Sequence, residues 1–300
     1  MAVVLEVIHT STYRYGRAVR FGPHRLMFRP RASHDLQVLS ASVEVSPAAR
    51  ISWMSDVHSN SVNVIEPLAP AARLSIDARL RVRHLGAQLP RAPLAEGARD
   101  WPLAYSAEDR RDLGALLEPH HPDPRGVLTD WIAPVAGHSI GTLAMLERLT
   151  ASIHALSYET RATEGTQSPT ETLERGAGSC RDFAWLLIES CRRLGLAARF
   201  VSGYLYDPAL DGEDAQASPP LQGAGATHAW AEIYLPGAGW TAYDPTNPQA
   251  GRARLIRVAV AREPRFAAPL SGLWWGEAED FLGLDVAVEV RRIEAPTAEA

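Results

Sequence analysis

The stretch that decides the fold is GAGSCRDFAWLLIESCRRLG, residues 176–195. A glycine-rich turn leads into an amphipathic run that starts at Cys180 and is closed by Gly195, which predicts a helix over residues 180–194. The start of a helix has unpaired N–H groups and partial positive charge, and both favour a thiolate. Cys180 is therefore a candidate nucleophile. Taken alone, this residue is explained equally well as a buried structural cysteine.

The second cysteine, Cys191, lies in the same predicted helix among Ile188, Leu194 and Leu196, and we expect it to be a core residue. The two cysteines would be about 16 Å apart along that helix, which is too far for a disulfide. The chain starts with a strand-like run rather than a signal peptide, so we expect a reduced, cytoplasmic protein. No apolar run is long enough to span a bilayer, and we expect no membrane partner.

A histidine follows in a strand-like segment. Residues 227–235, THAWAEIYL, alternate so that His228 and Trp230 share one face. The next run, Trp240–Asp244, ends at Pro245. An antiparallel hairpin brings the end of the second strand towards the start of the first, where Asp244 can orient the imidazole of His228.

The register of this hairpin presents a difficulty. A four-residue loop between Leu235 and Trp240 pairs Asp244 with Ala231, roughly 10 Å short of His228. We therefore predict a longer loop, or a β-bulge that shifts the register. Alone, each of these residues has an ordinary structural explanation, and only the set points to catalysis.

Together the three segments resemble the bacterial transglutaminase-like superfamily. The matching residues are Gly178-x-Cys180-Arg181-Asp182-Phe183-Ala184, His228-Ala229-Trp230-x-Glu232 and Gly239-Trp240-x-x-x-Asp244-Pro245-Thr246. The resemblance implies a papain-like α+β core in which the nucleophile helix packs on an antiparallel sheet. It also implies a catalytic triad in which Cys180 attacks an amide or ester carbonyl, His228 moves the proton and Asp244 orients His228.

The oxyanion and substrate sites have further candidates. The backbone N–H of Cys180 is a candidate oxyanion donor at the helix start. Tyr158 occupies a position where the family often has an aromatic residue, and it is the candidate for the second donor. Arg181 and Trp230, which lie close in sequence to Cys180 and His228, complete the candidate oxyanion or substrate-binding residues. We expect no metal and no cofactor, since the chain has no His-Glu-x-x-His and Asp207–Asp214 does not match a calcium loop.

The first 85 residues predict an antiparallel, β-sandwich-like domain. Short strand-like runs alternate with Pro, Gly, Ser and Asn turns, at Val3–His9, Gln37–Val45, Ser61–Ile65 and Leu74–Val82. The segments His9–Tyr15 and Leu26–Pro30 resemble the N-terminal β region found ahead of the core in many bacterial members. That region usually carries an Asp-x-x-Gly-Asn turn, and the nearest match here, Asp56–Asn60, lacks the glycine.

The rest of the chain predicts an α+β catalytic core over residues 106–293, joined to residues 1–85 by a linker, 86–105, and followed by a flexible tail, 294–300. Helices are expected at 106–118, 141–156, 168–175 and 180–194, and strands at 198–206, 227–235, 240–244, 254–260 and 286–293. The long loop Asp207–Ala226 joins the strand after the nucleophile helix to the strand with His228. We expect it to overhang the cleft and to gate or select substrates.

The leading functional hypothesis is a cysteine protease or amidase that acts on a peptide or protein substrate. The alternatives are a protein-glutamine transamidase, and a non-catalytic peptide-binding or scaffolding protein on the same fold. An intact triad argues against the last. The net charge of −5 is modest and provides no reason to expect a nucleic-acid partner.

Overall fold

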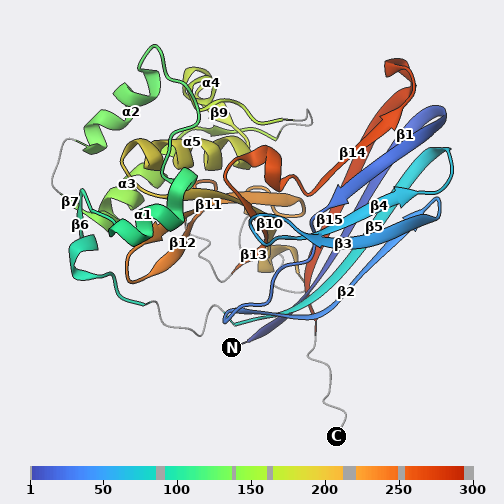
Figure 1. Ribbon diagram of the computed structural model, residues 1–300, viewed down its shortest axis with the longest axis horizontal. Coiled ribbons are helices and arrows are strands. Elements are labelled where there is room, and N and C mark those ends of the chain that lie inside the picture. The colour runs from blue at the N-terminus through green and yellow to red at the C-terminus, as the bar shows by residue number, and fades with distance from the viewer. Residues whose placement is uncertain are drawn as a thin grey trace, which may run out of the picture.

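The structure is a computed structural model that describes residues 2–85, 92–136, 140–160, 165–211, 221–248 and 254–293. It has two parts that lie side by side, a curled antiparallel sheet and a core of helices packed on a second sheet (Figure 1). No helix among the described residues is long and apolar enough to cross a membrane. The predicted tail, 294–300, lies outside the described residues.

The first sheet is organised around one long strand. Its N-terminal strands are β1 (Val3–Leu26), β2 (Leu36–Ser46), β3 (Ala49–Ser55), β4 (Ser61–Pro67) and β5 (Ala71–His84). β1 is 24 residues long. Its first half pairs with β5, and its last residues pair with β4, so the sheet curls along the strand. The four strands predicted in this region are confirmed, and β3 is an additional one.

The C-terminal end of the chain returns to this first sheet. β14 (Leu270–Trp275) and β15 (Phe281–Ile293) both pair antiparallel with β1 (Figure 1). The sequence predicts a catalytic core that extends to residue 293, but the strand pairing places β14 and β15 in the first sheet. The reason is that an unpaired edge of β1 would leave its N–H and C=O groups without partners, and β15 supplies them.

The core contains a four-stranded antiparallel sheet in the order β12-β11-β10-β13. Its strands are β10 (Ala198–Leu205), β11 (Thr227–Leu235), β12 (Gly239–Tyr243) and β13 (Leu255–Ala261). The helices are α1 (Ala107–Leu113), α2 (Val127–Ala136), α3 (Thr142–His154), α4 (Pro169–Arg175) and α5 (Cys180–Arg193). α5 packs against β11 and β10, as expected for the nucleophile helix (Figure 1).

Two short ladders complete the core. β6 (Asp100–Trp101) pairs with β7 (Ile140–Gly141), and β8 (Ser157–Tyr158) pairs with β9 (Ala177–Gly178). Residues 92–105 of the predicted linker pack on the core rather than hanging between two domains. The buried Tyr105 hydroxyl donates to the carbonyl of Tyr234 at 2.8 Å and accepts from the N–H of Ala197 at 3.0 Å.

Two of the helices differ from the sequence prediction. The helix expected over 106–118 ends at Leu113, because Gly114 takes a φ of +42° and starts a 3-10 turn. α2 was not predicted. Its N-terminal N–H groups are capped by the side chain of Asp123, which lies several residues before the helix and accepts from Leu128 and Thr129. A cap at that distance does not match the usual spacing of a helix start.

Polar side chains join the first sheet to the core. The buried His9 of β1 contacts the Tyr204 hydroxyl of β10, with 2.9 Å between Nδ1 and Oη. Asn60 makes two hydrogen bonds with the backbone of Val260 in β13, at 2.7 and 2.9 Å. Ser59 takes the place of the family's glycine and adopts a φ of +63°. The turn therefore keeps a left-handed residue at this position without a glycine.

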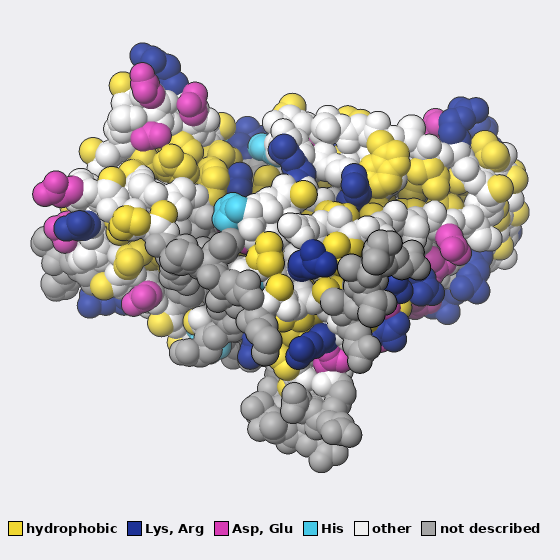
Figure 2. Space-filling model, turned by 90° about the horizontal axis from the view of Figure 1, so that it is seen from below, with side chains coloured by type: hydrophobic (Ala, Val, Ile, Leu, Met, Phe, Trp, Pro, Cys, Tyr) yellow, Lys and Arg dark blue, Asp and Glu magenta, His cyan; other side chains and the backbone are white. Residues whose placement is uncertain are grey.

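The surface of the first sheet is partly apolar. Figure 2 shows hydrophobic side chains gathered on that half of the molecule, with arginine side chains among them. The exposed apolar residues on its strands include Trp53, Met54, Leu273, Trp275 and Leu282.

Candidate active site

Cys180 is the first residue of α5, as the sequence predicts. Ser179 caps the helix and Asp182 completes a capping box with it. A side chain at Gly178 would press against Asp182, Phe183 and Thr172, with contacts of 3.0 to 3.3 Å from its Cβ. The glycine therefore allows the turn before Cys180 to pack closely on the helix.

The Asp182 carboxylate fixes this turn, and the sequence analysis assigned it no role. It is fully buried. Oδ2 accepts from the N–H and hydroxyl of Ser179 at 2.8 and 2.7 Å, and Oδ1 accepts from the N–H of Gln167 at 2.7 Å. The signal that could have identified this role is the Ser-x-x-Asp spacing of residues 179–182, which is close to a capping box.

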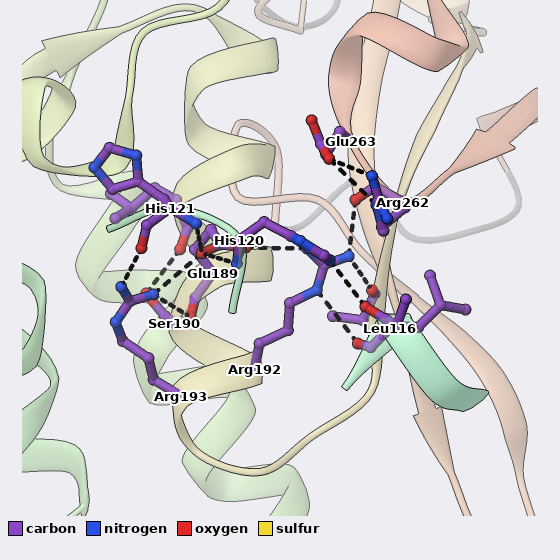
Figure 3. A network of polar contacts seen from close by, with 12 residues as sticks. Leu116, His120, His121, Glu189, Ser190, Arg192, Arg193, Arg262 and Glu263 are labelled. Carbon is purple, nitrogen blue, oxygen red and sulfur yellow. Dashed lines mark hydrogen bonds and ion pairs between the residues drawn. The ribbon is translucent and has the colours of Figure 1, made fainter. Parts of the chain in front are cut away.

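The other end of α5 is held by a buried ionic network (Figure 3). The Glu189 carboxylate is buried and accepts from the backbone N–H groups of His120 and His121. It also pairs with Arg192 at 3.0 Å and with Arg193 at 3.1 Å. Because α5 is buried nearly all round, its polar residues need such partners. The amphipathic helix expected from the sequence is present and lies in the centre of the core, with its polar residues buried as well.

Arg192 extends this network to the neighbouring strands. Its guanidinium donates to the carbonyls of Ala198, at 2.9 Å, and Arg262, at 2.7 Å (Figure 3). These bonds tie the helix to the start of β10 and the end of β13. The position of the Cys180 end relative to the sheet is therefore set from both ends of α5.

His228 and Asp244 are in direct contact. Nε2 of His228 lies 2.7 Å from Oδ2 of Asp244. The His228 side chain has no exposed surface, and 5% of the Asp244 side chain is exposed. The contact that the sequence analysis required between these two residues is present in the structure.

The register brings them together in a different way from the one predicted. Leu235 pairs with Gly239 and Ala231 with Tyr243, so the turn between the strands is shorter than four residues and no bulge interrupts the pairing. Asp244 is the first residue beyond the paired strand, and continuing the same register would place it opposite Trp230. It therefore lies on the face of His228 and reaches it diagonally, a separation that cross-strand side chains can span.

The second oxygen of Asp244 holds the turn that follows. Oδ1 accepts from the N–H of Thr246 at 2.9 Å and from the N–H of Asn247 at 3.2 Å. Burial alone would raise the pKa of Asp244, but the charge and hydrogen bond of His228, together with these N–H groups, lower it. Asp244 is therefore held as a carboxylate.

Nδ1 of His228 is the ring nitrogen left for Cys180. Among the described residues it has no hydrogen-bond partner of full geometry. Burial alone would lower the pKa of His228, but the effects of Asp244 and then Cys180 outweigh it and raise this pKa to about 10. Asp244 and Cys180 thus both favour the imidazolium form, as a thiolate–imidazolium pair requires.

Tyr158 reaches the site through a parallel pairing. β8 and β9 align Tyr158 with Gly178, two residues before Cys180. Burial first, and then the nearby Cys180 and Asp244, raise the pKa of Tyr158 to about 12, so its hydroxyl keeps its proton. The Tyr158 ring also packs edge-on against Phe183 of α5.

Arg181 and Trp230 differ in their placement. Trp230 is 1% exposed and its ring stacks on that of His228, with centroids 6.1 Å apart. It supports the His228 ring from the core, and its burial argues against the predicted role in substrate binding. Arg181 is the second residue of α5, is partly exposed, and acts electrostatically on Tyr158.

Cys191 provides an internal comparison with Cys180. It is fully buried in the core, as predicted, and burial raises the pKa of its thiol to about 12. Neither cysteine forms a disulfide. The two thiols of the chain therefore occupy contrasting environments, and among the described residues Cys180 interacts with a histidine, His228.

Known proteins resemble this chain over nearly all of its length. A family model of the bacterial transglutaminase-like N-terminal region matches residues 5–83, and a model of the transglutaminase-like superfamily matches residues 137–245. Uncharacterised proteins of Mycobacterium tuberculosis and Mycobacterium leprae are 27% and 26% identical, over 95% and 96% of this chain and 91% and 99% of their own.

A solved structure has the same fold. It is a protein of Cytophaga hutchinsonii described as a candidate cysteine protease, and it is 20% identical, with a TM-score of 0.68. The match covers 99% of this chain and 93% of that chain. The expected α+β fold is confirmed. The chain belongs to the transglutaminase-like superfamily, with a bacterial transglutaminase-like N-terminal region ahead of the core.

Proposed function

We propose that this protein is a cysteine-dependent acyl-transfer enzyme that acts on peptide or amide bonds through Cys180, His228 and Asp244. The observation that carries the proposal is the buried 2.7 Å contact between His228 Nε2 and Asp244, which leaves Nδ1 for a thiol at the start of a helix. This arrangement holds the imidazole in one orientation and favours its charged form.

The reaction follows from the positions of these groups. The Cys180 thiolate attacks the carbonyl carbon, a C–S bond forms, and the carbonyl electron pair moves onto oxygen. We propose that the N–H of Cys180 and the hydroxyl of Tyr158 donate to this oxyanion. As the oxyanion collapses, the C–N bond breaks and His228 gives its Nδ1 proton to the leaving amine. The product is a thioester on Cys180.

The thioester is then resolved by an acceptor activated by His228. Water gives a carboxylic acid, and a primary amine gives a new amide. We propose hydrolysis, because a solved structure with the same fold is described as a candidate cysteine protease. Incubation with glutamine-containing peptides, with and without a primary amine, separates the two: ammonia and a glutamate product without incorporation of the amine support hydrolysis. The chemistry needs a reduced thiol, which supports the cytoplasm as the place where the protein acts.

Alkylation of the cysteines tests the proposed nucleophile. With iodoacetamide between about pH 5 and 7, where an ordinary thiol is mostly protonated, we expect rapid labelling of Cys180 and none of the buried Cys191. His228→Ala and Asp244→Asn should each move the labelling of Cys180 to higher pH, since both remove support for the thiolate–imidazolium pair. Peptide mapping by mass spectrometry gives the rate at each cysteine. A Cys180 profile identical in all three proteins would contradict the triad.

A further inference from the structure

A tight turn lies directly over the catalytic pair. Leu221 to Ala224 form it, and the N–H of Ala224 donates to the carbonyl of Leu221 at 3.2 Å. Gly223, the third residue, has a φ of +78°. This is the conformation that a type II turn requires at its third position, and it favours glycine there.

Gly223 lies close to two groups that the proposed reaction uses, the Tyr158 hydroxyl and Nδ1 of His228. A Cβ at this position would lie 3.1 Å from the hydroxyl of Tyr158 and 3.2 Å from Nδ1 of His228. The backbone of the turn therefore occupies the space next to the ring nitrogen that must reach a substrate. The His228 side chain has no exposed surface and Cys180 is 8% exposed. In this conformation a peptide carbonyl and its leaving nitrogen have no room beside Nδ1.

The side chain of Asn247 clamps this turn in place. Its Oδ1 accepts from the N–H of Gln222 at 3.0 Å, and its Nδ2 donates to the carbonyl of Gln222 at 2.9 Å. Asn247 is 7% exposed. A second anchor is the buried Asp207, whose Oδ2 accepts from the N–H of Leu221 at 2.6 Å. The backbone N–H and C=O of Gln222 are thus both held by the side chain of Asn247.

Asn247 links the clamp to the triad, but through a different atom. Its backbone N–H donates to Oδ1 of Asp244, whose Oδ2 contacts His228. Removing the amide side chain of Asn247 would therefore release the turn and leave the backbone contact with Asp244 in place. The clamp can be tested separately from the triad.

We propose that the Leu221–Ala224 turn is a cover over Cys180 and His228, and that the side chain of Asn247 holds it closed until substrate displaces it. The proposal rests on the proposed function and adds a regulation of the same site. The bonds between Asn247 and Gln222 break and re-form as the cover opens and closes. Asn247 acts through the cover and is a positioning residue.

The test is the accessibility of the Cys180 thiol in Asn247→Ala. Loss of two hydrogen bonds should shift the opening equilibrium by roughly tenfold or more. At one fixed pH, we expect iodoacetamide to label Cys180 about tenfold faster than in the unchanged protein, with a larger gain for a bulky fluorescein maleimide. Hydrogen–deuterium exchange should also become faster at the N–H of Gln222, which has lost its acceptor.

The chain contains a matched control. Asn60 makes the same two-way contact with the backbone of Val260, where the first sheet meets β13. Asn60→Ala removes this pair of hydrogen bonds, together with one from Nδ2 to Asp56 at 2.8 Å, and should leave the labelling rate of Cys180 unchanged. Equal acceleration by both variants, or none by Asn247→Ala, would overturn the cover. If Asn247→Ala does not fold, Asp207→Ala releases the other anchor, and unchanged labelling in that folded variant would also overturn it.

Failure of the cover and failure of the triad give different results. The triad is tested by the pH at which Cys180 becomes reactive and by its dependence on His228. The cover is tested by the rate at a single pH and by its dependence on the size of the reagent. If Cys180 reacts at low pH in a way that depends on His228, but Asn247→Ala has no effect, the cover alone is rejected. If the pH profile of Cys180 is that of an unperturbed thiol, the proposed function is rejected.

Discussion

At the scale of single residues, the two oxygens of Asp244 and the two ring nitrogens of His228 have different surroundings. Each oxygen of Asp244 has its own partners, His228 for one and the backbone of Thr246 and Asn247 for the other. The two ring nitrogens of His228 are divided in the same way. One is occupied by the carboxylate, and the other is the nitrogen that exchanges a proton with the thiol and the leaving group in the proposed reaction.

Tyr158→Phe is the sharpest test at this scale. The pKa of Tyr158 is raised to about 12, so the hydroxyl is a proton donor throughout the working range of pH. If it donates to the oxyanion, its removal should lower the rate of acylation by p-nitrophenyl acetate about 10²- to 10³-fold. The pH profile of Cys180 alkylation should not move, because alkylation forms no oxyanion.

Tyr206→Phe is the control for this change. The pKa of Tyr206 is also raised to about 12, but its hydroxyl donates to Asp211. We expect little change in acylation. A Tyr158→Phe enzyme as fast as the unchanged protein would show that Tyr158 is not the second donor.

At the scale of elements, helix α5 sets the position of Cys180. Asp182 joins its first turn to the segment before it. Near the other end of the helix, Glu189 accepts from the backbone of the His120–His121 segment, and Arg192 donates to the backbone at the start of β10 and just after β13. These are buried charged groups, and each is costly unless every partner is present. The helix therefore depends on polar contacts at both ends as much as on its apolar packing.

Glu189→Gln should destabilise the fold strongly. It leaves the guanidinium of Arg192, which is fully buried, without its counter-charge. Breaking one partner of a buried pair costs about 3–5 kcal/mol. The free energy of unfolding from urea denaturation measures this. The exposed pair of Glu174 and Arg125 provides the control, since Glu174→Gln should cost less than about 1 kcal/mol. Equal effects of the two substitutions would contradict a structural role for the network.

At the scale of the whole molecule, buried histidines connect the first sheet to the core. Burial lowers the pKa of His9 to about 4, and it lowers those of His24 and His84 as well. His9 and His84 contact β10 and β13, so the junction between the two parts contains groups that resist protonation. The free energy of unfolding of the protein is therefore expected to depend on pH.

The direction of this linkage can be worked out for His9. Between about pH 6.5 and 4 the unfolded chain binds a proton that the folded protein does not, so stability falls as the pH falls through this range. The full effect for His9 is up to about 3 kcal/mol. His228 does not oppose it, because its folded pKa is raised and both states are protonated below pH 6.5.

His9→Asn should therefore reduce the loss of stability between pH 7 and 4. Urea unfolding at both pH values measures the difference, and we expect the variant to lose less stability than the unchanged protein. Replacement of the exposed His34 by Asn is the control and should leave the loss unchanged. If His9→Asn and the unchanged protein lose the same free energy, the linkage does not lie at this junction.

Much of the site follows from local pattern. The glycine turn, the capping residues and the apolar periodicity of residues 176–195 are sufficient to place Cys180 at a helix start, because these preferences act within a few residues. The same holds for β11, whose alternation places His228 and Trp230 on one face. The order of the three motifs was readable too, and it identified the superfamily.

Only the tertiary structure decided how distant segments meet. The diagonal reach of Asp244, the parallel pairing that brings Tyr158 to Gly178, and the clamp from Asn247 to Gln222 each depend on the exact path of a turn or an edge. The pairing of β14 and β15 with β1 is of the same kind. Strand edges accept any partner of suitable shape, so local sequence does not specify which one arrives. The elements that carry Cys180, His228 and Asp244 were therefore predictable from the chain, and the contacts that surround these residues were not.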